Sequence, residues 1–365
     1  MNYLLKRTLG RTGLQVSAIG FGGTWICEIG MDDAVKVVRR AFDLGVTYFD
    51  TARWDGDSEE KMGAALEPVR DKCVISTKTG SRTKKESLED LQNSLAKLRT
   101  DKVDLIQLHG IDDEATLEKA MSPDGALATC KEARSKGLVD FVGISSHKPD
   151  ILIKAIKTDE FDTVLVPINV ITRQALEKLV PFAKDRNIGV VVMKPLSAKT
   201  SKLITCLYQP SLSLLSDEPE LHELLGKDKA EMAQSALRFL LAQDISVTIP
   251  GMRSVEEVEA NVKAGNEFKG LTSSEKKRFE SKLAKDYCRD CGLCQPCAQK
   301  VDVASILRFH ALYESYGLKN WARKLYSGLE VRADACNKCG ECEPKCAYGL
   351  PVVEKLKKAH SDLKS

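Results

Sequence analysis

The chain has 365 residues, enough for one domain of roughly 250 residues and a smaller second one. Its 55 basic and 52 acidic residues are interspersed and leave a formal net charge of +3, which argues against a nucleic-acid or anionic-lipid partner. The sequence begins without the apolar segment of a signal peptide and contains no apolar run of membrane-spanning length, so we expect a soluble cytoplasmic protein without membrane insertion.

From residue 18 onward, short β-branched apolar runs alternate with longer segments of helical period, which is typical of β/α units. The predicted strands are Ala18–Gly22, Val46–Asp50, Val74–Lys78, Leu105–His109, Phe141–Ile144, Val164–Pro167, Val190–Met193 and Val247–Ile249. Helices between them include Asp32–Leu44, Ser87–Leu98, Arg173–Asp185 and Ala230–Ala242. The strands are apolar on both faces, and eight such repeats predict an α/β protein with a parallel (β/α)8 TIM barrel.

Two segments depart from this repeat. Tyr3–Val16 is predicted to form a hairpin that closes the bottom of the barrel. Ser197–Lys229 is longer than an ordinary connection, and long loops at the carboxyl end of a barrel often form substrate lids. It mixes leucine and serine without a clear period, so we predict no secondary structure for it.

The barrel is predicted to span residues 1–275, and residues 276–365 form the second domain. This domain carries two cysteine-rich runs with helical patterns between them, at Val303–Tyr316 and Trp321–Gly328. The segment between the runs is too long for a compact ferredoxin. We therefore expect a mainly α-helical, ferredoxin-like module.

Each cysteine run places two residues between its first three cysteines and adds a fourth close behind. This spacing lets one turn of backbone hold three thiolates against one face of a [4Fe–4S] cluster, while in two-cluster ferredoxins the fourth ligand comes from the other run. The predicted ligand sets are Cys288, Cys291, Cys294 and Cys346 for one cluster, and Cys336, Cys339, Cys342 and Cys297 for the other. Structural zinc and a disulfide framework are the alternatives, and neither requires this spacing in both runs.

Motifs at the predicted strand ends carry a resemblance to a known family. The chain contains, in order, LGRTGLQVSAIGFGG, YFDTA, ISTK, LIQLHG, GISSH, VVMKPL and IPGMRSVEEVEANV. This set resembles the aldo-keto reductase superfamily, and in particular its branch with a C-terminal ferredoxin-like 4Fe-4S domain. The resemblance implies a barrel that binds a nicotinamide cofactor without a Rossmann fold, and the G-x-G-x-x-G motif of that fold is absent.

The family's catalytic tetrad is Asp, Tyr, Lys and His, and Asp50, Lys78 and His109 fall on three of its positions. Where the family has roughly DTA-x-x-Y-x-x-SE, this chain reads DTARWDGDSEE, with Asp55 in place of the tyrosine that protonates the carbonyl oxygen. Three interpretations stay open: Asp55 is a re-purposed acid/base residue, His109 or water is the proton donor, or the hydride chemistry is lost. We expect Asp55 to form an ion pair with Lys78, which would lower the pKa of Asp55. Burial of Asp55 would instead raise that pKa.

By the same resemblance, Ser145 would hold the carboxamide of the cofactor and Asn169 would lie near the nicotinamide. Lys194 and Leu196 would follow the pyrophosphate. The adenosine end would be lined by Pro250, Gly251, Met252, Arg253, Glu257 and Asn261. Arg253 favours the 2′-phosphate of NADPH whereas Glu257 repels it and favours NADH, so the choice stays open. Trp25 is either a pocket wall or ordinary packing, and His147 either touches the cofactor or faces solvent.

The sequence predicts an iron-sulfur oxidoreductase that couples a nicotinamide- or carbonyl-handling barrel to one-electron transfer through two [4Fe–4S] clusters. Its partners would be a ferredoxin-like carrier or a larger redox enzyme, together with a small-molecule substrate. The alternative is an electron-transfer subunit of a redox complex whose barrel has lost carbonyl reductase activity. A third hypothesis, lyase or isomerase chemistry with Asp55 and Lys78 as base and acid, leaves the clusters without a role.

Overall fold

The computed structural model describes residues 4–170, 172–196, 225, 229–281, 288, 293–315, 317–346 and 348–364. The chain divides into two compact units, Met1–Leu196 with Ala233–Gly270, and Ser197–Met232 with Leu271–Ser365. The C-terminal part of the second unit begins at Leu271, a few residues before the predicted boundary, and the unit also includes Ser197–Met232, which the prediction had placed in the barrel. The predicted lid segment, residues 197–229, lies almost entirely outside the described residues.

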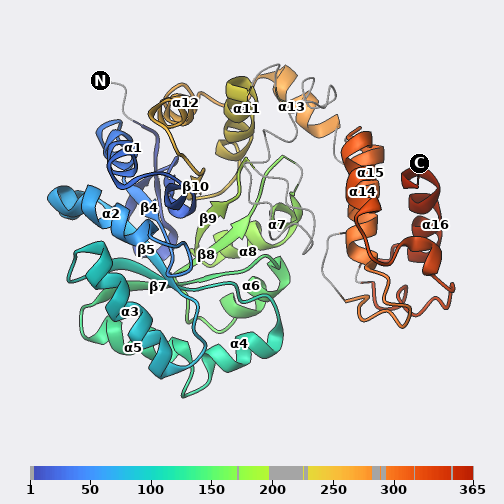
Figure 1. Cartoon of the computed structure of the whole chain (residues 1–365), viewed down its shortest axis with the longest axis horizontal. Coiled ribbons are helices and arrows are strands. Elements are labelled where there is room, and N and C mark those ends of the chain that lie inside the picture. Colours follow the sequence, from blue (N-terminus) through green and yellow to red (C-terminus); the bar gives the residue numbers. More distant parts are fainter. Residues whose placement is uncertain are drawn as a thin grey trace. The chain divides into compact units, whose positions relative to one another are not determined.

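Eight parallel strands form the sheet of the first unit (Figure 1). They are β3 (Phe21–Gly22), β4 (Tyr48–Asp50), β5 (Val74–Thr79), β6 (Val103–Leu108), β7 (Val139–Ser145), β8 (Thr163–Pro167), β9 (Gly189–Met193) and β10 (Val247–Ile249), and each pairs with the next in chain order. Parallel bridges join Ile19 to Thr248 and Gly22 to Gly251, so the first and last strands meet. Because both edges of the sheet are joined, the predicted barrel is confirmed.

Helices alternate with these strands (Figure 1). They are α1 (Met31–Asp43), α2 (Ser58–Leu66), α3 (Lys84–Leu98), α4 (Glu114–Met121), α5 (Ala126–Ser135), α6 (Pro149–Ile156), α7 (Gln174–Glu177), α8 (Leu179–Asp185), α11 (Lys229–Leu241) and α12 (Val255–Asn266). One predicted helix, Arg173–Asp185, is wrong because it divides at Lys178. Pro181 has no N–H for the carbonyl of Glu177, and its ring clashes with that carbonyl in a continuous helix.

The predicted hairpin closes the bottom of the barrel. Strands β1 (Lys6–Thr8) and β2 (Gln15–Ser17) pair antiparallel. Leu9 and Val16 belong to the buried core cluster inside the barrel, together with Tyr48. Gly10 lies so close to the start of β9 that a Cβ there would come within 2.1 Å of the backbone nitrogen of Gly189. The hairpin therefore packs at the amino ends of the strands, opposite the end where this fold carries chemistry.

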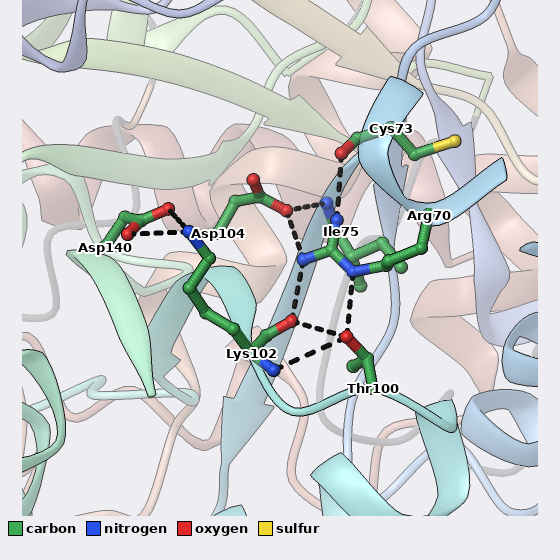
Figure 2. Close-up of polar contacts among 7 residues, drawn as sticks. All are labelled: Arg70, Cys73, Ile75, Thr100, Lys102, Asp104 and Asp140. Atoms are coloured by element: carbon green, nitrogen blue, oxygen red, sulfur yellow. Dashed lines mark hydrogen bonds and ion pairs between the residues drawn. The ribbon is translucent and has the colours of Figure 1, made fainter. Parts of the chain in front are cut away.

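A cluster of hydrogen bonds around Arg70 connects two segments at the amino ends of the barrel strands (Figure 2). The Arg70 guanidinium donates to Thr100 Oγ1 at 3.1 Å, to the Cys73 carbonyl at 3.0 Å, and to Asp104 Oδ2 and the Lys102 carbonyl at 2.7 Å each. Asp104 Oδ2 also accepts from a backbone N–H of β5 at 2.9 Å. One planar cation thus joins the segment before β5 to the start of β6.

The second unit is helical where it is described. Its helices are α13 (Ser273–Ser281), α14 (Val303–Ser315), α15 (Lys319–Ser327) and α16 (Val352–Leu363), so both predicted helical patterns are confirmed. Tyr326 is fully buried, and its hydroxyl bonds to His360 Nδ1 at 2.7 Å and accepts from the Ala333 N–H at 3.1 Å. His310 Nε2 lies 2.7 Å from Asp362. Of all helices in the described ranges, none is long and apolar enough to cross a membrane.

Candidate active site

A buried ion pair lies at the carboxyl ends of β4 and β5. Asp50 and Lys78 are each only 4% exposed, and Lys78 Nζ pairs with Asp50 Oδ2 while donating to the Thr51 carbonyl at 2.7 Å. Gln107 of β6 donates to the second carboxylate oxygen of Asp50 at 3.1 Å and to Ser76 Oγ at 2.6 Å. Gln107 thus satisfies the oxygen that Lys78 leaves open, a role that sequence motifs did not indicate.

His109 follows β6 at the same end of the barrel. Burial, and after it the positive charge of Lys78, lower the pKa of His109 to about 3. The imidazole is therefore neutral at neutral pH, and within the described residues its buried Nδ1 has no hydrogen-bond partner. The ring of Trp54 lies 5.0 Å away, centroid to centroid, and 63% of Trp54 is exposed. Arg82 holds the backbone here by donating to the His109 carbonyl at 2.6 Å.

Asp55 lies in the loop after β4, where it accepts a hydrogen bond from Thr24 Oγ1 at 3.0 Å. The expected ion pair with Lys78 is wrong: among the described residues Lys78 pairs with Asp50 instead. Burial raises the pKa of Asp55, the nearby charge of Lys78 opposes that shift, and Asp50 adds to it. The expectation of a lowered pKa is wrong because burial of Asp55 outweighs the charge of Lys78, whose ammonium group pairs with Asp50.

The amino end of α2 positions this loop and the 3₁₀ segment η2 (Gly23–Glu28) after β3. Lys61 is 3% exposed, and its ammonium donates to the carbonyls of Ile29 and Ile26 at 2.7 and 3.1 Å and pairs with Asp57 at 2.8 Å. Ser58 Oγ donates to the Gly23 carbonyl at 2.8 Å. Apart from the local pair of Lys61 with Asp57, these contacts join segments more than 30 residues apart in sequence, so no local pattern predicted them.

The residues expected to hold the nicotinamide end lie on neighbouring strands. Ser145 is buried at the end of β7, and its hydroxyl accepts from the Gly110 N–H at 2.9 Å. Asn169, after β8, donates to the Lys194 carbonyl at 3.2 Å. Lys194 Nζ in turn lies 2.6 Å from His147 Nε2, so His147 contacts one of the residues expected to bind the cofactor. Leu196 is the last described residue before the predicted lid.

His147 also contacts Asp112. Its Nδ1 lies 3.0 Å from Asp112 Oδ2, and its backbone N–H donates to Oδ1 at 2.7 Å. Burial alone would raise the pKa of Asp112, but the hydrogen bonds from His147 outweigh it and hold that pKa well below its usual range. A carboxylate, an imidazole and an ammonium group are thereby linked at the barrel mouth.

The residues expected at the adenosine end follow β10 and enter α12. Ser254 caps α12 by accepting from the Glu257 N–H at 3.3 Å, and the Glu257 carboxylate accepts from the N–H of Arg253, the residue before the cap, at 2.7 Å. Pro250 is buried, Met252 is fully buried and Asn261 is 3% exposed, whereas Gly251 is partly exposed. A bound ligand could therefore meet the backbone of Met252 but not its side chain.

Comparison with known proteins assigns the chain to a family. The sequence matches the profile of the Aldo/keto reductase family over residues 18–284. The chain belongs to the aldo/keto reductase family. It is 30% identical to L-galactose dehydrogenase of Arabidopsis thaliana over 309 residues, covering 74% of this chain and 91% of the plant protein.

Solved structures agree with this assignment. The holo form of aldo-keto reductase AKR11C1 from Bacillus halodurans is 27% identical, with a TM-score of 0.63 over 78% of this chain and 97% of that one. An aldo/keto reductase from Klebsiella pneumoniae, in complex with NADP and acetate, shares the fold with a TM-score of 0.59 at 22% identity, over 76% and 95% of the two chains. This chain is thus an oxidoreductase of the aldo-keto reductase type, and the family match ends before its first cysteine run.

The cysteine runs of this aldo/keto reductase lie in the second unit. Cys291 lies outside the described residues, while Cys288, Cys294, Cys297 and the four cysteines of the second run lie within them. Cys336, Cys339, Cys342 and Cys346 are thiols outside any disulfide. Across the described ranges no three Cys, His or acidic side chains are arranged as a metal site. The donors fit two [4Fe–4S] clusters in kind and number, but the described ones do not converge on a ligand geometry.

Proposed function

We propose that this chain is a nicotinamide-dependent oxidoreductase of a small carbonyl or alcohol substrate, in which Asp55 replaces the family's tyrosine as the acid/base group. The observation that carries the proposal is a protonatable carboxyl beside the Asp50–Lys78 pair, with burial raising its pKa. A nicotinamide, when bound, supplies or accepts the hydride. In this proposal the proton of the reaction comes from Asp55.

In the direction of reduction, neutral Asp55 gives its proton to the carbonyl oxygen while hydride adds to the carbonyl carbon, and the product is the alcohol. Asp55 is left as a carboxylate, which accepts from Thr24 and is favoured by the charge of Lys78, and solvent restores its proton. Oxidation runs through the same groups in reverse. His109 is neutral, so it can orient the carbonyl oxygen by hydrogen bonding but does not act as an imidazolium acid.

The residues at the nicotinamide end fit such a cofactor. Ser145 and Asn169 place polar groups at the ends of β7 and β8, and the relative from Klebsiella pneumoniae was solved with NADP. The exposed face of Trp54 beside His109 offers an apolar wall for the substrate. These contacts support a nicotinamide dinucleotide lying from β7 round to β10.

We further propose that the second unit holds two [4Fe–4S] clusters and exchanges electrons with a ferredoxin-like carrier or a larger redox enzyme. The support is the spacing of the eight cysteines, with Cys288, Cys291, Cys294 and Cys346 as one ligand set and Cys336, Cys339, Cys342 and Cys297 as the other. Such a cluster, when bound, exchanges one electron at a time. A carbonyl reductase alone needs no such group, so the tail implies a further redox partner.

The proposal is tested with Asp55→Asn, which keeps the shape of the side chain but removes its exchangeable acid proton. We expect kcat for NADH-dependent reduction of small aldehydes to fall by about 10²–10⁴-fold, with the nucleotide Kd unchanged. Thr24→Val is the matched control, because it removes the hydrogen bond to Asp55 but keeps the carboxyl group. Full activity in Asp55→Asn would show that another group supplies the proton.

A second candidate is an electron-transfer subunit whose barrel no longer handles hydride. The observation that favours it is the loss of the tyrosine itself. On this account Asp55→Tyr gains carbonyl reductase activity that the native chain lacks, whereas the acid/base proposal requires turnover by the native chain.

A further inference from the structure

The barrel closure brings the segment after β3 against the segment after β10. The indole of Trp25 in η2 covers Gly251, where a Cβ would lie 1.9 Å from Trp25 Cδ1. The Arg253 guanidinium lies over the Trp25 ring, 5.8 Å from its centroid. Its Nη1 pairs with Glu28 Oε2 at 3.1 Å. Glu28 thus pairs with the cation that we expect to meet the adenosine end of a nucleotide.

Glu28 is presented from a fixed backbone. The Lys61 ammonium binds the carbonyls on either side of it, of Cys27 at 3.4 Å and of Ile29 at 2.7 Å, and Ile26 is fully buried. The side chains of Glu28 and Arg253 are 44% and 35% exposed, so a ligand can reach both. The pair is therefore held by its surroundings and remains open to solvent.

A second carboxylate lies close to the same arginine. Glu257 Oε2 accepts from the backbone N–H of Arg253, which holds this carboxylate at the start of α12. A 2′-phosphate binding Arg253 would have to displace Glu28 and would face the negative charge of Glu257. A ribose 2′-hydroxyl carries no charge and can donate to a carboxylate, as in NAD sites of other folds.

We propose that Glu28 and Arg253 form a selectivity pair that makes this barrel bind NADH in preference to NADPH. The inference rests on the proposed function, since it requires a nicotinamide dinucleotide bound along residues 250–261, which follow β10. Glu28 occupies the guanidinium, so Arg253 stabilises the η2 segment over Gly251 instead of a phosphate. Removing the carboxylate of Glu28 frees the guanidinium for a 2′-phosphate.

The test is isothermal titration of the full-length protein with NADH and with NADPH, comparing native chain and Glu28→Gln. We expect the native chain to bind NADH more tightly. Glu28→Gln should tighten NADPH binding by about tenfold, the equivalent of one charge-assisted hydrogen bond, and leave the NADH Kd nearly unchanged. The gain should disappear when Arg253→Gln is added to Glu28→Gln, because the freed cation is then lost.

Glu259→Gln is the matched control. Glu259 lies on α12 and forms a similarly exposed ion pair with Arg40 at 2.6 Å, and it is not among the residues expected to line the adenosine end. The Glu259→Gln variant should leave the Kd values for NADH and NADPH unchanged. Because exposed pairs contribute little to stability, all these variants should melt close to the native protein.

The outcomes separate the two proposals. A native preference for NADPH, or an unchanged NADPH affinity in Glu28→Gln with NADH still bound, overturns the selectivity pair and leaves the proposed function standing. Should Glu28→Gln misfold, Glu257→Gln still tests the repulsion, and an unchanged NADPH Kd there overturns it. Failure of every variant and of the native chain to bind either nucleotide overturns the proposed function itself.

Discussion

A neutral His109 is a consequence of burial that can be measured directly. With a pKa of about 3, only about one imidazole in ten thousand is protonated at pH 7, so imidazolium cannot be the working acid. Folding is linked to this group. Between pH 6.5 and pH 3 the unfolded chain binds a proton at His109 that the folded chain does not, so stability is lost as pH falls through that window. At pH 4.5 the loss amounts to about 2–3 kcal/mol.

The perturbation is His109→Gln, which keeps an N–H donor and removes the titration. Urea unfolding of the barrel at pH 7 and pH 4.5 should show the native chain losing about 2–3 kcal/mol more than the variant. His310→Gln is the control, because His310 belongs to the helical unit and bonds to Asp362. The chain has five histidines, so NMR can follow each ring. A His109 resonance titrating near pH 6.5, or equal losses in native chain and variant, would refute the reasoning.

Other predictions follow from the same contacts. Because Asp55 must be protonated to act as acid, the rate of carbonyl reduction should fall as pH rises through its raised pKa and alcohol oxidation should rise, a profile that Asp55→Asn should lack. Arg70→Ala should lower the free energy of unfolding by about 2–4 kcal/mol without changing nucleotide affinity, since it removes the ion pair of Asp104, whose carboxylate is only 15% exposed; unchanged urea midpoints would contradict this. Anaerobic reconstitution should load about eight iron atoms per chain, and Cys342→Ser should lose one cluster signal in electron paramagnetic resonance; iron-free protein would contradict the cluster proposal.

The fold could largely be predicted because its signals are local. Apolar runs bounded by turn residues located every strand of the barrel, and β10 begins and ends at the predicted residues. The first strand is shorter than predicted because residues before Phe21 join the last strand through isolated bridges. The single helix predicted at 173–185 is two helices, because Pro181 has no N–H to bond the carbonyl four residues earlier and its ring clashes with that carbonyl.

The site could be predicted only where motifs carry it. Asp50, Lys78 and His109 come from strand ends that local pattern locates, whereas Gln107 and Lys61 act on residues distant in sequence. The state of Asp55 depends on whether burial or Lys78 dominates, and that balance requires the structure, which gives Lys78 to Asp50. The same holds for Glu28, whose partner Arg253 lies at the other end of the barrel sequence.

The central claim is that this barrel transfers hydride with Asp55 as the acid. The most direct measurement is anaerobic incubation of the full-length protein with NADH deuterated at the transferable position and 4-nitrobenzaldehyde as the probe carbonyl, followed by mass analysis of the alcohol. We predict deuterium on the alcohol carbon with the native chain and at least about 10²-fold less product with Asp55→Asn. Deuterated alcohol formed equally by both would contradict the role of Asp55, and no labelled alcohol from the native chain across a panel of aldehydes would contradict hydride transfer itself.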